Sequence, residues 1–95
     1  MENKLEELIK KPLELVLVTD GLDNDVVKNI VNYCRGFKCK AFKRGNMLRL
    51  EFPFEEATKI SLQEFGENLS TISQKEVKGK IIDKKLGFTF GKGIE

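Results

Sequence analysis

The segment from Leu13 to Thr19, LELVLVT, constrains the fold of this chain more than any other stretch. It is nearly continuous in apolar residues, and a run of this kind is typical of a strand buried on both faces. Asp20 and Gly21 follow directly and predict a turn. We therefore expect this strand to be buried on both faces or to take a central place in a sheet.

Helical patterns lie on both sides of that strand. Leu5, Leu8 and Ile9 recur at helical spacing and predict a short helix over residues 2–11, which Pro12 ends. This helix is too short to be stable alone, so it would have to pack on the rest of the chain.

A second helix is expected after the turn. Asp23 or Asp25 can cap its start, and Gly36 supplies its end. One face of this helix is apolar, formed by Val27, Ile30, Val31 and Cys34. The chain from residue 13 to residue 36 is thus predicted as a strand, a turn and a helix.

The stretch from Phe37 to Phe52, FKCKAFKRGNMLRLEF, predicts a β-hairpin with its turn at Gly45 and Asn46. The alternation predicts one apolar face, expected in the core: Phe37, Cys39, Ala41, Leu48, Leu50 and Phe52. The opposite face is mostly cationic and holds Lys38, Lys40, Phe42, Met47, Arg49 and Glu51. One side of the hairpin is therefore expected in the core and the other on the surface.

The second half of the chain predicts one more helix and two strands. Ser61 followed by Glu64 is a capping-box pattern, and a helix is expected over at least residues 62–70, while residues 53–61 stay ambiguous between helix and strand. Strands are expected over 75–82 and 86–90, followed by a loose tail with glycines at positions 91 and 93. The whole chain, 1–95, is predicted as a single domain.

This order of elements predicts the fold class: an α+β two-layer sandwich with a ferredoxin-like βαββα(β) core, a short N-terminal helix and a C-terminal β-hairpin. Both helices of the core would then lie on one face of an antiparallel or mixed sheet.

The composition excludes several kinds of chemistry. The chain has no His, so neither a Ser-His-Asp triad nor a His-dependent zinc site can form. Cys34 and Cys39 match neither a C-x-x-C pair nor a common zinc spacing, and both lie at apolar positions typical of core packing. Adjacent lysines would lower the pKa of either thiol if it were exposed. We predict no catalytic residue, no metal and no cofactor.

No secretory signal and no apolar run near the length of a membrane span is visible. The expected location is cytoplasmic, with no membrane contact, reduced thiols and no disulfide-linked partner.

Charge is unevenly distributed along the chain. Between Arg35 and Arg49 the sequence holds six cations and no acid, whereas between Glu51 and Glu67 it holds five acids and one Lys. Lys and Arg bind phosphates, and an exposed aromatic among them can stack on a base. The hairpin is therefore predicted to bind RNA or DNA through Lys38, Lys40, Phe42, Lys43, Arg44 and Arg49.

The βαββα order and the run from Lys43 to Phe52, KRGNMLRLEF, resemble an RNA-recognition motif over about sixty residues. The resemblance implies binding of single-stranded RNA across the sheet. Where that motif carries stacking aromatics, this chain has Met47 and Arg49, and the strand from Leu13 to Thr19 has no aromatic. Membership in that family is not inferred.

Two other hypotheses remain open. The opposed basic and acidic segments, and the partly apolar faces of the last two strands, would suit a homodimer or a partner-binding module without catalytic activity. Asp20, Asp23 and Asp25 follow the first strand, where a Mg²⁺-dependent enzyme would place carboxylates, although the same acids suit a turn and a helix cap.

Overall fold

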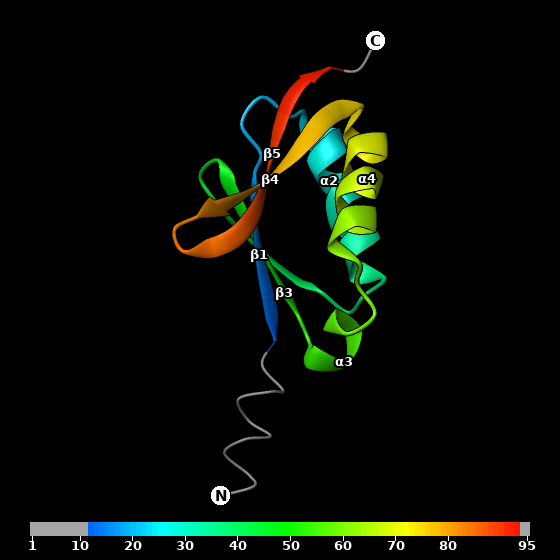
Figure 1. The fold of residues 1–95 in the computed structure, drawn as a ribbon. Helices are drawn as coiled ribbons and strands as arrows, with labels where there is room; N and C mark the ends of the chain where they lie inside the picture. The colour runs from blue at the N-terminus through cyan, green and yellow to red at the C-terminus, as the bar shows by residue number, and fades with distance from the viewer. Residues whose placement is uncertain (1–11, 94–95) are drawn as a thin grey trace, which may run out of the picture.

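The computed structural model describes residues 12–93, so the helix expected over residues 2–11 lies outside the described part. Within that part a sheet forms with the strand order β2-β3-β1-β5-β4. Its strands are β1 (Leu13–Val18), β2 (Lys40–Arg44), β3 (Met47–Phe52), β4 (Lys75–Ile82) and β5 (Lys85–Gly93). The helices are α2 (Asn24–Arg35), α3 (Phe54–Ala57) and α4 (Leu62–Ser73). Helices α2 and α4 both cover one face of the sheet, which gives two layers (Figure 1).

Strand β1 is the centre of the sheet, as its sequence predicts. It pairs antiparallel with β3 along its whole length and parallel with β5 over residues 16–18. Leu15 and Leu17 point toward the helices and are fully buried, while Val16 points to the opposite side and is also buried. Both faces of this strand are therefore covered.

The α+β class and the C-terminal hairpin agree with the sequence-based prediction, but the ferredoxin-like strand order is not confirmed. Strand β4, which follows α4, lies at the edge of the sheet, and β5 takes the place beside β1. Because β5 runs parallel to β1 while the other neighbouring strands pair antiparallel, the sheet is mixed.

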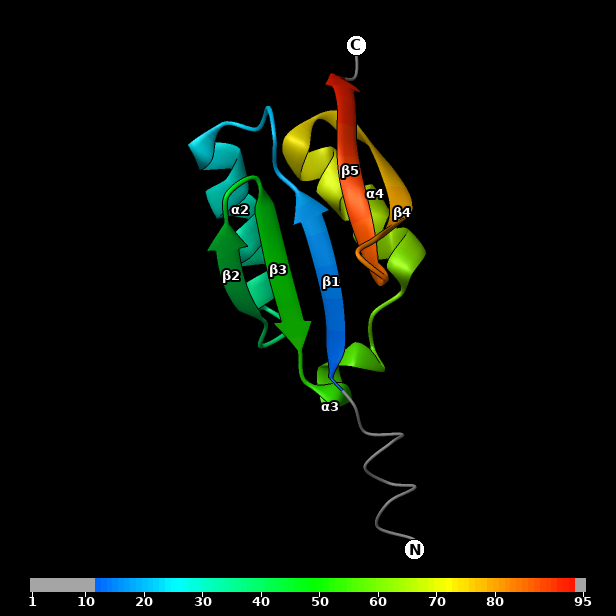
Figure 2. The same cartoon turned by 90° about the vertical axis from the view of Figure 1, so that its left-hand side faces the viewer.

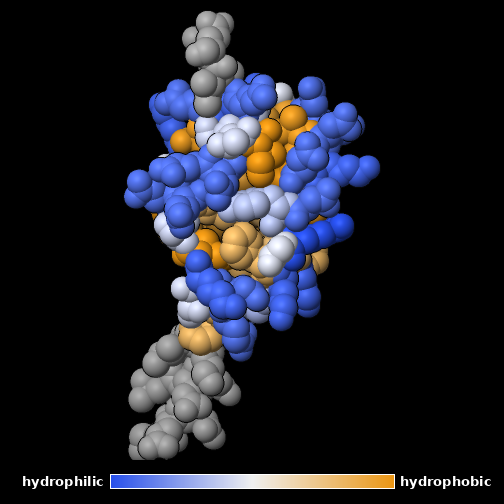
Figure 3. Space-filling model, turned by 90° about the vertical axis from the view of Figure 1, so that its right-hand side faces the viewer, coloured by the Kyte–Doolittle hydropathy of each residue, from blue (hydrophilic) through white to orange (hydrophobic). Residues whose placement is uncertain are grey.

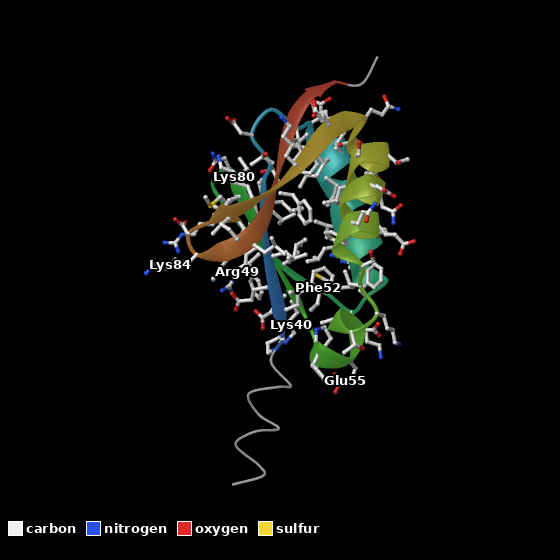
Figure 4. All side chains as sticks on the ribbon, viewed as in Figure 1. Lys40, Arg49, Phe52, Glu55, Lys80 and Lys84 are labelled. Atoms are coloured by element: carbon white, nitrogen blue, oxygen red, sulfur yellow. The ribbon has the colours of Figure 1, made fainter. Side chains whose placement is uncertain are left out.

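The core lies between the sheet and the two long helices. Phe52 on β3 points toward the helices (Figure 4), and its ring packs edge-on against Phe65 of α4, with 5.7 Å between ring centroids. The Nδ2 group of Asn68 donates a hydrogen bond of 2.9 Å to the Tyr33 hydroxyl, which ties α4 to α2. The outer sides of the helices are largely hydrophilic, with apolar surface visible between them (Figure 3).

Helix α4 begins where the capping box predicts. The Ser61 side chain accepts a hydrogen bond from the backbone N–H of Glu64 at 3.3 Å. The helix extends three residues past the expected minimum of Ser70 to Ser73, and Gln74 ends it in a left-handed conformation. The ambiguous segment before it forms the single turn of α3.

Three local expectations are wrong. The first strand of the hairpin begins at Lys40 instead of Phe37, because residues 36–38 turn and Lys38 adopts a φ of 57°. Ala41, expected in the core, is exposed because β2 is an edge strand. The expected tail is the end of β5, which continues to Gly93 by pairing with β4.

The tip of the β4–β5 hairpin projects on the side of the sheet away from the helices (Figures 1 and 4). Asp83 and Lys84 both have positive φ values, 49° and 65°, which form the two-residue turn that suits twisted hairpins. A Cβ atom at Gly87 would lie only 2.6 Å from the Val16 carbonyl oxygen and 2.7 Å from Ile82 Cδ1. The absence of a side chain at Gly87 thus allows Ile82 to pack against β5, the strand beside β1.

Replacing Gly87 with Ala tests this packing. We expect Gly87→Ala to lower the free energy of unfolding by about 1–3 kcal/mol, because the methyl group collides with a backbone oxygen that cannot move freely. Urea unfolding followed by circular dichroism measures the change. Gly79→Ala on β4 is the control, since the nearest atom to its Cβ is 4.0 Å away. Equal stabilities for the two variants would contradict this account of Gly87.

Candidate functional site

The side of the sheet away from the helices, here called the open face, is seen in Figure 2. The pairing of β2 with β3 brings Lys40 opposite Glu51, Phe42 opposite Arg49 and Arg44 opposite Met47. These side chains share the open face because Leu48 and Leu50, the intervening residues of β3, are buried toward the helices. Figure 4 shows Arg49 on this side.

Phe42 and Arg49 form a stacked pair on the open face. The Arg49 guanidinium carbon lies 4.7 Å from the centroid of the Phe42 ring, a cation–π contact. The Phe42 side chain is nevertheless 44% exposed. The sequence predicted Phe42 on the outer face of the hairpin, and the structure confirms this. The pair presents an aromatic ring and a planar cation to solvent together.

A hollow of about 740 Å³ lies on the open face between the two hairpins. The β2–β3 hairpin and the tip of the β4–β5 hairpin line it from opposite sides, with Val16 of β1 between them. Its lining residues are Val16, Phe42, Lys43, Arg44, Met47, Arg49, Asp83 and Lys85. The hollow therefore combines cations, apolar surface and one carboxylate.

A backbone contact at the end of β1 holds the β2–β3 turn in position beside this hollow. The carbonyl oxygen of Asn46 accepts hydrogen bonds from the backbone N–H of Thr19 at 2.8 Å and from its hydroxyl at 3.1 Å. Gly45, the other turn residue, has the φ of 61° that this kind of turn needs. Because the turn is tied to β1, Met47 is held opposite Val18 and Arg49 opposite Val16.

The structure brings together most, but not all, of the predicted binding residues. Phe42, Lys43, Arg44 and Arg49 line the hollow, and Lys40 lies on the open face outside it. Lys43 projects from the edge strand at a position opposite Leu48, so it also borders a second hollow of about 480 Å³ beside α2.

Lys38 is the exception among the predicted residues. It lies in the turn between α2 and β2, before the strand begins, and it is absent from the lining of the hollow. The alternation from Phe37 onward predicted it on the cationic face, but alternation holds only within a strand.

Four lining residues were not predicted as part of the site: Val16, Met47, Asp83 and Lys85. The sequence identified residues 83–85 only as a turn. Local sequence patterns do not show which strand of the sheet this hairpin packs beside. Their position depends on the parallel pairing of β5 with β1, which only the folded sheet provides.

Lys85 is held at the margin of the hollow by an ion pair with Glu14 of β1. The Lys85 Nζ and Glu14 Oε2 atoms are 2.7 Å apart. The hydrogen bond and the charge of Lys85, with a smaller contribution from Arg49, hold the pKa of Glu14 below its ordinary value. The positive charge of Lys85 is thus largely balanced within the protein.

The two cysteines are free, and Cys34 is buried as expected for core packing. Interaction with Cys39, together with burial, raises the pKa of the Cys34 thiol. Interaction with Cys34 lowers the pKa of Cys39, which is only partly buried and whose thiol donates to the Lys40 carbonyl oxygen at 3.3 Å.

The acids proposed for a Mg²⁺ site are not gathered. Asp20, Asp23 and Asp25 are all exposed, and Asp23 occupies the N-cap position of α2 without a side-chain hydrogen bond to the helix. Among residues 12–93, no group of three or more acidic, Cys or His side chains is close enough to hold a metal ion.

The apolar residues behind the homodimer hypothesis lie mostly within this chain. Leu86, Phe88 and Phe90 pack in or against the core, and Ile82 lies against Gly87. Ile81, 67% exposed, is the most exposed large apolar side chain of the described residues. No helix within residues 12–93 is long and apolar enough to span a membrane.

The Glu14–Lys85 pair gives a prediction about pH. Because the folded-state pKa of Glu14 is lowered, the pair stabilises the fold above the ordinary carboxyl pKa, and this contribution is lost as the pH falls through the folded-state value. We expect Glu14→Gln to lower the free energy of unfolding by less than about 1 kcal/mol at neutral pH, since the pair is partly exposed. The difference in free energy of unfolding between the variant and the unaltered protein should vanish in acid. Urea unfolding at neutral pH and at a pH below the folded-state pKa of Glu14 measures it.

The control for this variant is Glu76→Gln. Glu76 lies 3.9 Å from Lys78, and both side chains are mostly exposed. We expect Glu76→Gln to leave the free energy of unfolding unchanged at both neutral and acid pH. A deficit of Glu14→Gln that persisted in acid would show that the packing of the Glu14 side chain, and not its charge, is responsible.

Comparison of the chain with protein-family models, curated proteins and solved structures finds no match. Its function is therefore inferred from the charge and geometry of its own residues.

Proposed function

We propose that this chain binds RNA or DNA through the open face of its sheet, without catalysing a reaction. The observation that carries this proposal is the stacked pair of Phe42 and Arg49, which is exposed at the border of a hollow with further cations around it. Such a surface offers both kinds of contact that nucleic acids use, cations for phosphates and a planar surface for bases.

The charge on the open face favours an anionic ligand. Lys40, Arg44 and Arg49 project from β2 and β3 on this side, opposed within those strands only by Glu51. The register of β4 against β5 puts Lys78 and Lys80 on the same side as Gly87 and Thr89. Cations so arranged can follow a phosphate backbone and release its condensed counterions.

The stacked pair of Phe42 and Arg49 adds a stacking surface for bases, which cations alone do not provide. An exposed aromatic ring beside a guanidinium is a good stacking surface for a base, because every base has a π-face. A partly exposed Phe among cations therefore combines stacking and phosphate contacts on one surface.

The homodimer hypothesis has less support. Both edge strands carry cations, with Lys40, Lys43 and Arg44 on β2 and Lys78 and Lys80 on β4. Charged side chains on an edge disfavour pairing with a second copy. Light scattering over a range of concentrations tests this hypothesis directly.

The charge contribution is tested with Lys40→Gln and Arg44→Gln. Each should weaken binding of short RNA and DNA oligonucleotides and reduce the slope of log affinity against log salt by about 1, because each removes about one phosphate contact. Fluorescence anisotropy at several salt concentrations measures both quantities. Lys28→Gln, on the exposed side of α2, is the matched control and should change neither. No binding by the unaltered protein at low salt would refute the proposal.

The stacking contribution is tested with Phe42→Ala. We expect a loss of about 1–3 kcal/mol of binding free energy for single-stranded oligonucleotides, with an unchanged salt slope, because a stacking surface is removed and no charge is lost. The fold should be retained, since Phe42 lies outside the hydrophobic core. Ile81→Ala removes an even more exposed apolar side chain outside the hollow and should bind normally. Equal affinity of both variants would exclude Phe42 as a stacking residue.

A further inference from the structure

The charges around the hollow are arranged unevenly. Lys43, Arg44 and Arg49 line it from the β2–β3 hairpin, whereas Asp83 lines it from the tip of the β4–β5 hairpin. Building on the proposed function, we infer that the hollow takes one unstacked base of a single-stranded nucleic acid and prefers guanine, whose Watson–Crick edge meets the Asp83 carboxylate.

The hollow has the size of a small-ligand pocket, and its walls favour an unstacked base over a duplex. Its volume of about 740 Å³ lies within the range of about 300–1,000 Å³ that small-ligand pockets occupy. Hairpins border it on two sides, with Val16 of β1 between them. A base has to leave its stack to enter such a space, and single strands allow this at much lower cost than duplexes.

Asp83 sets the direction in which the nucleotide lies. A carboxylate repels phosphate, so the phosphates belong on the side of Arg44, and the base extends toward Asp83. Among the described side chains no cation forms an ion pair with Asp83, while Lys85 beside it is paired with Glu14. The Asp83 carboxylate therefore retains its capacity to accept hydrogen bonds from a ligand.

The remaining lining suits the faces of a base. Met47 offers apolar surface, and Phe42 adds the ring that is stacked with Arg49, while the almost fully buried Val16 lies between the two hairpins. Met47 is unbranched and adapts its shape to a flat partner. A base in this hollow thus contacts apolar groups with its faces and Asp83 with its edge.

Guanine is the base whose edge best matches a carboxylate. Its N1–H and N2–H₂ groups are adjacent donors, and the two carboxylate oxygens of Asp83 can accept one hydrogen bond from each of them. Uracil and thymine instead present one N–H between two carbonyl oxygens, and these oxygens repel a carboxylate. Cytosine and adenine offer a single amino group on that edge. Good bidentate pairs of this kind discriminate by about tenfold or more.

The test compares short uridine oligomers that carry a single central guanine, cytosine or adenine with the all-uridine oligomer, each in RNA form and in the corresponding thymidine DNA form. We expect the unaltered protein to bind the guanine oligomer about tenfold more tightly than the uniform oligomer, and Asp83→Asn to reduce this ratio to near one. Asn tolerates the left-handed φ of 49° at this turn, so the hairpin should be retained.

The matched control is Asp20→Asn, which removes the same charge from an exposed turn outside the hollow and should keep the guanine preference. If Asp83→Asn fails to fold, Asp83→Gly, which also suits a positive φ, replaces it. Tight binding by the unaltered protein with no preference among bases, or tighter binding of a duplex of the same sequence, would overturn this inference while leaving the proposed function intact. Absence of binding to every oligonucleotide would instead refute the proposed function.

Discussion

The double pairing of β1 is the constraint on which the rest of the structure depends. This strand binds β3 on one side and β5 on the other, so both hairpins are anchored to it. Leu15 and Leu17 fill the core beneath the helices, and their alternation with Glu14 and Val16 sets the register. A slip of one residue would turn the buried leucines to the open face, so the register is strongly specified.

The hollow on the open face follows from this arrangement. Because β3 and β5 flank β1, the two hairpins converge from opposite sides on the surface of the central strand. Gly87 allows the β4–β5 hairpin to pack close to β1, and the Glu14–Lys85 pair ties the tip of this hairpin to β1. Cations and a stacked aromatic ring come from one hairpin, and a carboxylate comes from the other, so the charge is uneven across a short distance.

Local features of the sequence predicted much of this structure. The capping box at Ser61, the turn at Gly45, the apolar run of β1 and the exposure of Phe42 are each governed by neighbours close in the chain. The errors occurred where local patterns compete with a turn, as at Lys38, or where an edge position leaves a small residue uncovered, as at Ala41. In these places alternation alone did not show where the strand begins or how deeply it is buried.

The sequence by itself determined the α+β class, the strands and the two long helices of the described residues, and four of the hollow's lining residues: Phe42, Lys43, Arg44 and Arg49. Only the tertiary structure decided that β5 lies beside β1 in parallel and that Asp83 consequently faces those residues across the open face. The physical reason is the range of the interactions. Periodicity, capping and turn preferences act over a few residues, whereas the choice of a strand's neighbour depends on burying apolar surface between segments far apart in the chain.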